Sequence, residues 1–190
     1  MSKVNQARRR KVAFVISLLL IVATRLIFPT PVRATNPFIT TAYSADPSSH
    51  VFLGRMYVYP SHDRNDAQRF DMNDYHVYSS DDLANWRDDG VILSIKNISW
   101  AKPGSALWAP DCNFKNGAYY LYYPVTHAGM GVAVGPAPAG PFKDSGRPIP
   151  NVSGIDPAVF MDDDGQAYLY WAGHGCQGGK LKPNMTELAV

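Results

Sequence analysis

Residues 109–123 have the sequence APDCNFKNGAYYLYY, a pattern that recurs along the chain. A short strand-like run ends in a tight turn at Gly117, and a second run rich in tyrosine follows. Two other stretches repeat the pattern: residues 46–59, DPSSHVFLGRMYVY, and residues 156–171, DPAVFMDDDGQAYLYW. The proline and the turn glycine are 7, 7 and 8 residues apart. Each stretch therefore predicts a β-hairpin.

A second hairpin follows each of the first two. It is marked by an aromatic residue four positions before a glycine, Trp86 before Gly90 and Phe142 before Gly146. Two hairpins make four strands, the content of one propeller blade. We therefore predict an all-β protein of the β-propeller class, with blades at 43–100 and 105–150 and the first half of a third at 154–190. Meanders and sandwiches are the alternatives, which the repeated pair of hairpins disfavours.

The first 34 residues predict a secretory signal peptide. A basic cluster precedes an uncharged run, residues 12–24, and Val32-Arg33-Ala34 offers a cleavage site. An uncleaved membrane anchor is the alternative, but 13 uncharged residues are too few to cross about 30 Å of hydrocarbon. We expect a secreted or periplasmic protein without a stable membrane span, in which residues 35–190 form an incomplete propeller domain.

The charge of the chain depends on this leader. Residues 35–190 contain 11 basic and 16 acidic side chains, a net charge of −5, although the whole chain has a net charge of +2. No basic patch remains for phosphates, so no nucleic-acid partner is expected. The cysteines, Cys112 and Cys176, could pair in an oxidising compartment, but their strand-like surroundings favour two buried thiols.

Two aspartates occupy the same place in two repeats. Asp46 and Asp156 each precede a proline at the start of a blade's first strand. A residue before proline is driven toward extended geometry, and equivalent strand starts lie on one rim of a propeller. We therefore expect both carboxylates to face one central funnel. Asp-Pro is also an ordinary turn signal, but Ala109 in the equivalent place of the second repeat argues that strand entry does not require aspartate.

Several motifs together resemble glycoside hydrolase family 43. The resemblance covers roughly residues 36–182 and is carried, in order, by Ala45-Asp46-Pro47, Ser79-Ser80-Asp81-Asp82-Leu83-Ala84-Asn85-Trp86, Trp108-Ala109-Pro110-Asp111, Asn116-Gly117-Ala118-Tyr119-Tyr120-Leu121-Tyr122-Tyr123 and Gly154-Ile155-Asp156-Pro157-Ala158-Val159-Phe160. It implies a five-bladed propeller and inverting hydrolysis of arabinose- or xylose-containing plant-type glycans. It also implies that Asp46 is the general base and that Asp156 tunes the pKa of the acid. Trp108 would wall the sugar subsite, although a core tryptophan is an equal alternative.

The catalytic acid of that family is a glutamate that opens a later strand. In the family this glutamate typically precedes Gly-Pro. Glu187 is the single glutamate of this chain, and no Glu-Gly-Pro motif is present. We therefore expect a fragment without its acid and with little or no activity. A non-catalytic carbohydrate-binding propeller or an inactive remnant is the alternative function.

No cofactor or metal is expected. No two histidines stand at metal-ligand spacing along the chain, and the run Asp162-Asp163-Asp164-Gly165 lacks the ligand pattern of a calcium loop. His62 and His76 could reach the funnel, but hydrogen-bonded loop histidines are more common, and this is how both are interpreted.

Overall fold

The computed structural model describes residues 33–189. The predicted signal peptide therefore lies outside the described residues, apart from Arg33 and Ala34. Residues 34–190 form one compact unit. In the described part of the chain, no helix is long and apolar enough to span a bilayer.

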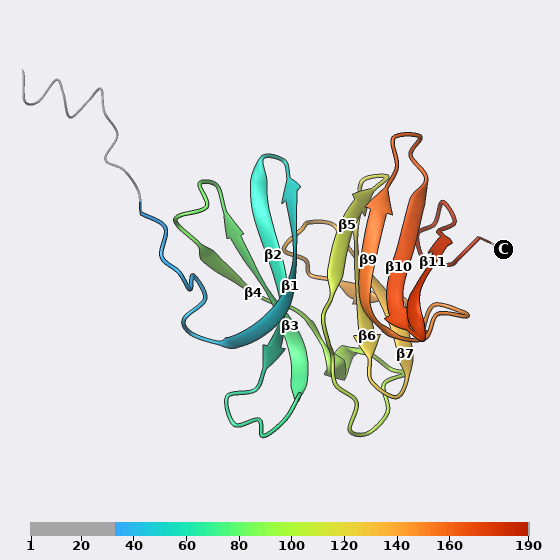
Figure 1. Cartoon of the computed structure of the whole chain (residues 1–190), viewed down its shortest axis with the longest axis horizontal. Coiled ribbons are helices and arrows are strands. Elements are labelled where there is room, and N and C mark those ends of the chain that lie inside the picture. Colours follow the sequence, from blue (N-terminus) through green and yellow to red (C-terminus); the bar gives the residue numbers. More distant parts are fainter. Residues whose placement is uncertain (1–32, 190) are drawn as a thin grey trace, which may run out of the picture. The chain divides into compact units, whose positions relative to one another are not determined.

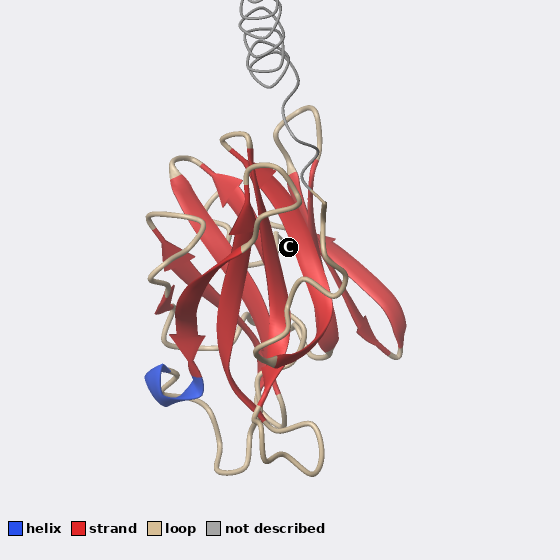
Figure 2. Ribbon diagram, turned by 90° about the vertical axis from the view of Figure 1, so that its left-hand side faces the viewer, coloured by secondary structure: helices blue, strands red, loops and turns tan. Residues whose placement is uncertain are grey.

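The unit consists of three antiparallel sheets that follow one another along the chain (Figure 1). Figure 2 shows that strands dominate and that the described residues contain one short helix, η1 (Ile95–Asn97). The first sheet contains β1 (Tyr43–Phe52), β2 (Arg55–Asp63), β3 (Met72–Ser80) and β4 (Arg87–Ser94). The second contains β5 (Asp111–Lys115), β6 (Ala118–Val125), β7 (Gly129–Gly135) and β8 (Lys143–Asp144). The third contains β9 (Ile155–Met161), β10 (Ala167–Gly173) and β11 (Gly175–Lys180).

The turn glycines close the three predicted hairpins. Gly54, Gly117 and Gly165 have φ of 80°, 81° and 80°. Leu53 and Asn116, which precede the first two, are also in the left-handed region, so each two-residue turn has the backbone that twisted hairpins favour. The third hairpin uses a longer turn, which explains its longer proline-to-glycine spacing.

Two apolar layers hold the sheets together, one on each face of the second sheet. Leu121 and Tyr123 of β6 pack in the layer shared with the first sheet, while Tyr122 packs in the layer shared with the third. Since both faces of β6 are covered, its sequence is continuously apolar and aromatic, without the alternation of a half-exposed strand. This stacking of two four-stranded sheets and one three-stranded sheet is the predicted partial propeller.

The third blade differs from its prediction in two respects. It has three strands, because the glycine-rich β11 pairs with β10 and adds a strand to the predicted hairpin. Cys176 lies on this strand and is exposed, so the prediction of two buried thiols is wrong for Cys176 and confirmed for Cys112. The face of this blade that points away from the second sheet exposes Phe160 and Tyr170.

Candidate active site

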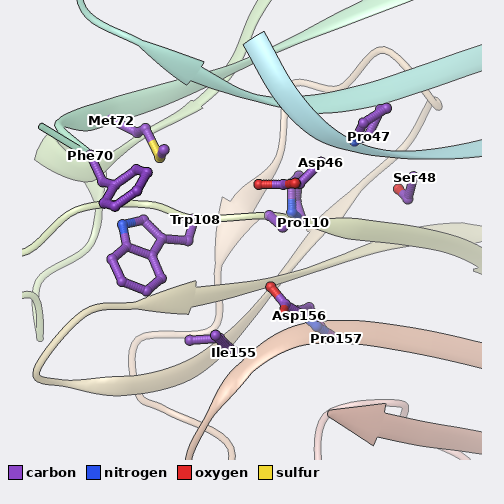
Figure 3. Close-up of a pocket in the computed structure, with 11 residues that line it drawn as sticks. Asp46, Pro47, Ser48, Phe70, Met72, Trp108, Pro110, Ile155, Asp156 and Pro157 are labelled. Carbon is purple, nitrogen blue, oxygen red and sulfur yellow. The ribbon is translucent and has the colours of Figure 1, made fainter. Parts of the chain in front are cut away.

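The first strands of the three blades bring the predicted site residues to one cavity. Asp46 on β1, Trp108 and Ala109 just before β5, and Asp156 on β9 all line a space of about 410 Å³. Figure 3 shows the carboxylates of Asp46 and Asp156 projecting into it from opposite sides, with Trp108 toward one end. The expectation that the two carboxylates face one funnel is consistent with this geometry.

A β-bulge aims each carboxylate. Asp46 and Pro47 together lie opposite one residue of β2, because Ala45 pairs with Ser61 and Ser48 with Tyr59. Bulges of this kind re-aim a side chain at the edge of a sheet. Proline has no N–H, so its place in the bulge forfeits no ladder hydrogen bond.

Asp156 and Pro157 repeat this bulge in the third blade. Ile155 pairs with Ala172, and Ala158 pairs with Tyr170, so two residues of β9 face one of β10. The backbone at Asp46 and Asp156 has φ of 48° and 54°. The prediction of extended geometry before proline is therefore wrong at both positions, because the bulge turns each aspartate into the left-handed region that Asp tolerates better than most residues.

Gly154 fixes the approach to the second bulge. Its φ is +153°, and a Cβ atom at this position would lie 2.0 Å from the carbonyl oxygen of Ala172. Only glycine lets β9 approach β10 this closely. Gly154 thereby helps to set the place of Asp156 two residues later.

An aromatic and thioether wall closes one end of the cavity. The rings of Phe70 and Trp108 lie edge to face, with centroids 5.9 Å apart, and Met72 lies beside them. Trp108 is half-buried, so it contributes to the packing and to the cavity lining together. Sequence reasoning missed Phe70 and Met72, since they stand on the β2–β3 connection and the start of β3, outside the repeated hairpins.

Asp156 is the carboxylate of this cavity with a raised pKa. Partial burial is the larger cause of this rise in pKa, and the negative charge of Asp46 is the smaller one. The side chain is nevertheless still exposed in this chain, so water screens both effects.

Asp111 ties together the strands that carry the site. It is 3% exposed and accepts hydrogen bonds from the backbone N–H groups of Cys112 at 2.9 Å and Val159 at 2.6 Å. Val159 donates to Oδ2 and Cys112 to Oδ1, and His50 Nε2 also lies 2.6 Å from Oδ1. One buried carboxylate thus links β1, β5 and β9.

Glu187 lies away from the cavity. Lys182 Nζ is 2.7 Å and Arg147 is 2.8 Å from its carboxylate oxygens. The hydrogen bond and charge of Lys182 lower the pKa of Glu187. A general acid needs a raised pKa, so the environment of Glu187 is opposite to the one that role requires.

The histidines considered from the sequence lie on strands. His62 is on β2 and contacts Asp74 at 2.5 Å, while His76 is on β3 and contacts Asp88 at 3.1 Å. Their hydrogen bonding is as expected, but their assignment to loops is wrong, because β2 and β3 extend further than the hairpin pattern indicates. Among the described residues, His62, Asp74 and His76 form a group with metal-ligating atoms close together.

The family model for glycosyl hydrolases family 43 matches residues 34–189. A xylosidase/arabinosidase 43A of Humicola insolens is 46% identical over 160 residues, which cover 77% of this chain and 48% of that protein. A xylosidase/arabinosidase of Bacteroides ovatus is 43% identical over 161 residues, covering 78% of this chain and 48% of its own length. The chain thus spans about half the length of these curated relatives.

A solved structure has a similar fold over most of this chain. It is the β-xylosidase/α-arabinofuranosidase CoXyl43 from a compost microbial metagenome, determined in complex with xylotriose. It superposes with a TM-score of 0.75 at 38% identity, covering 83% of this chain and 61% of that one.

Proposed function

The chain belongs to glycosyl hydrolases family 43, and we propose that it carries the general base and part of the substrate cavity of an inverting glycosidase for xylose- or arabinose-containing glycans. The observation that carries the proposal is the pair of bulged aspartates, Asp46 and Asp156, that face one aromatic-walled cavity. The relatives named as xylosidases and arabinosidases support a pentose-containing substrate.

Asp46 is the base in this proposal. Inversion needs a carboxylate that activates water on one face of the sugar and an acid on the opposite face, with about 6.5–9.5 Å between them. Asp46 projects into the cavity from β1 (Figure 3), where its oxygens can contact a water molecule. The indole of Trp108 offers an apolar surface on which a pentose ring packs.

Asp156 is proposed to act on the acid through its charge. Partial burial is the larger cause of the raised pKa of Asp156 and the charge of Asp46 is the smaller one, which supports an interaction between carboxyl groups in this cavity. A carboxylic acid bound close to Asp156 would be kept protonated for the same reason.

The acid itself is proposed to come from residues other than these 190. Glu187 is ion-paired, has a lowered pKa and does not line the cavity. The 190-residue chain is therefore expected to bind xylo-oligosaccharides weakly and to hydrolyse them at most slowly, because general acid catalysis typically contributes about 10²–10⁴-fold to the rate.

Hydrolysis of aryl β-xylosides and aryl α-arabinofuranosides tests the assignment in a chain extended by its downstream coding sequence. Asp46→Asn should abolish turnover and leave xylotriose affinity within about threefold, since the variant keeps the shape of the cavity. Asp163→Asn, on the β9–β10 turn, is the matched control. Nuclear magnetic resonance of the first-formed sugar anomer should show inversion. Full turnover by Asp46→Asn would remove Asp46 as the base.

A non-catalytic carbohydrate-binding propeller is the second candidate. It is favoured by the environment of Glu187, the single glutamate of the chain. Xylotriose binding without hydrolysis by the extended chain would support it.

We further propose that residues 1–34 are a cleaved signal peptide and that the protein is exported. Mass spectrometry of the exported protein should find Thr35 as its first residue. An intact Met1 would contradict cleavage.

A further inference from the structure

The first blade brings together side chains that are far apart in the sequence. Asp74 on β3 is the direct cross-strand partner of His62 on β2. His76 is two residues further along β3, on the same face of the sheet. One ligand atom of each residue lies within 4.8 Å of the others.

We propose that His62, Asp74 and His76 bind one divalent transition-metal ion of the zinc type. Two imidazoles and one carboxylate are ligands that zinc prefers, and they leave a fourth position for water. Calcium and magnesium prefer a shell made of oxygens, which two imidazoles do not supply. None of the three side chains lines the cavity around Asp46, so this site is separate from the candidate active site.

Binding of an ion requires only small movements of the three side chains. Zinc–ligand distances of about 2.0–2.2 Å place neighbouring tetrahedral ligands about 3.3 Å apart. His62 Nδ1 and Asp74 Oδ1 are 2.5 Å apart, so an ion that replaces their shared hydrogen needs to increase this distance by less than about 1 Å. The rings of His62 and His76 are already close, with centroids 4.6 Å apart. The three side chains are 20–29% exposed, which gives an ion a path from solvent.

Asp88 on β4 supplies the outer support that such a site needs. Its two carboxylate oxygens lie 3.1 and 3.2 Å from His76 Nδ1. Metal-bound histidines usually donate their second ring N–H to a carboxylate, which fixes the ring and its tautomer. With Nδ1 of His76 directed at Asp88, Nε2 is the nitrogen left for the metal.

The position of the ion gives it a structural role. Met72, which lines the active-site cavity, is two residues before Asp74 on the same strand, and Phe70 lies just beyond it. The pairing of β2 and β3 is irregular between His62 and Asp63, at the end of the ladder. An ion bound by both β2 and β3 would stabilise this end of their ladder and the positions of Phe70 and Met72.

The competing account is a ladder of two hydrogen-bonded pairs, His62 with Asp74 and His76 with Asp88, that binds no metal. Zinc titration of the metal-stripped 190-residue chain distinguishes the two accounts. The background should carry His174→Ala and Cys176→Ser, because these exposed side chains lie two residues apart and offer zinc an alternative site.

Calorimetry with zinc and the ligand-field absorption of bound cobalt(II) are the measurements. One equivalent should bind, and the melting temperature should rise with zinc, because the ion binds the folded state. His62→Gln and His76→Gln keep a side-chain N–H for the carboxylates but are poor zinc ligands, so each should weaken binding at least 10-fold. Asp88→Asn should weaken it by about 10–100-fold.

His127→Asn, on the β6–β7 turn, is the control and should leave zinc affinity unchanged. The absence of stoichiometric binding, or affinity that is unchanged in both glutamine variants while they melt as the parent does, would overturn the proposal in favour of the hydrogen-bonded ladder.

Discussion

Asp46 and Asp156 are placed by backbone geometry as well as by sequence. Both lie in the left-handed region, with φ of 48° and 54°, and both belong to a bulge. Asparagine shares the tolerance of aspartate for this region, whereas alanine is disfavoured there by about 1–2 kcal/mol. The conformation and the charge of these residues can therefore be changed separately.

Asp46→Ala should lower the free energy of unfolding by about 1 kcal/mol more than Asp46→Asn does, because only alanine meets the left-handed backbone without compensation. Urea unfolding of both variants measures the difference. Equal stabilities of the two variants would show that the bulge relaxes when Asp46 is replaced.

The pKa of Asp156 should fall when Asp46 is replaced by Asn. The substitution removes the like charge but keeps the partial burial, which is the larger cause of the rise. The pKa of Asp156 should therefore move toward its ordinary value without reaching it. Nuclear magnetic resonance titration of the Asp156 carboxyl carbon measures the change. An unchanged pKa would mean that the two carboxylates do not interact.

The same group has a defined effect on stability. A carboxyl with a raised pKa binds its proton more tightly in the folded protein than in the unfolded chain. Its contribution favours folding below the ordinary pKa and is lost as pH rises through the raised pKa. Asp156→Asn should remove this part of the pH dependence.

At the scale of strands, Asp111 is the connection on which the site depends. It accepts two backbone N–H groups and lies against His50, so it joins the first strands of all three blades. Replacing a buried acceptor leaves its donors unsatisfied, at about 1–3 kcal/mol for each group.

Asp111→Asn should therefore lower the free energy of unfolding by about 1–3 kcal/mol, because the amide has a single oxygen and cannot accept both backbone N–H groups in place. It should also weaken xylotriose binding through the displacement of β9. Thermal and urea unfolding measure the first effect. Asp162→Asn, on the β9–β10 turn, is the control. A loss of stability no greater than that of the control would contradict the role of Asp111.

The strands were predictable because their signals are local. The proline-to-glycine spacing and the tyrosine runs located the three first hairpins, and the equivalence of Asp46 and Asp156 followed from the repeat. The bulges were not predictable, because the preference of a residue before proline points to extended geometry and only strand pairing reverses it.

The histidine cluster was hidden for a related reason. His62 and Asp74 are 12 residues apart and become neighbours only through the register of β2 and β3. The pairing of β11 and the exposure of Cys176 likewise depend on neighbours and not on the sequence of β11 itself. Phe70 and Met72 reach the cavity from a connection whose path no repeat specifies.

At the scale of the whole molecule, the outer face of the third blade is apolar and uncovered in this chain. Phe160 is 52% and Tyr170 is 41% exposed, and both lie on the face opposite the buried Val159 and Leu169. Exposed aromatic residues on a sheet face favour association.

The 190-residue chain should therefore self-associate as its concentration rises. Sedimentation velocity measures this, and the double variant Phe160→Ser with Tyr170→Ser should shift association to higher concentration. Leu53→Asn, which removes an isolated exposed side chain at the β1–β2 turn, should leave it unchanged. A chain that stays monomeric at all concentrations would contradict the prediction.

The paired bulges also have a consequence for the history of such genes. Both aspartate codons become asparagine codons through one G-to-A transition. At Asp46 that transition removes the charge, but asparagine tolerates the left-handed backbone conformation. Natural selection for folding alone therefore does not remove the substitution. A gene that encodes the proposed glycosidase thus lies one mutation away from a well-folded sugar-binding protein, and duplicated copies can drift into lectin-like roles without an unstable intermediate.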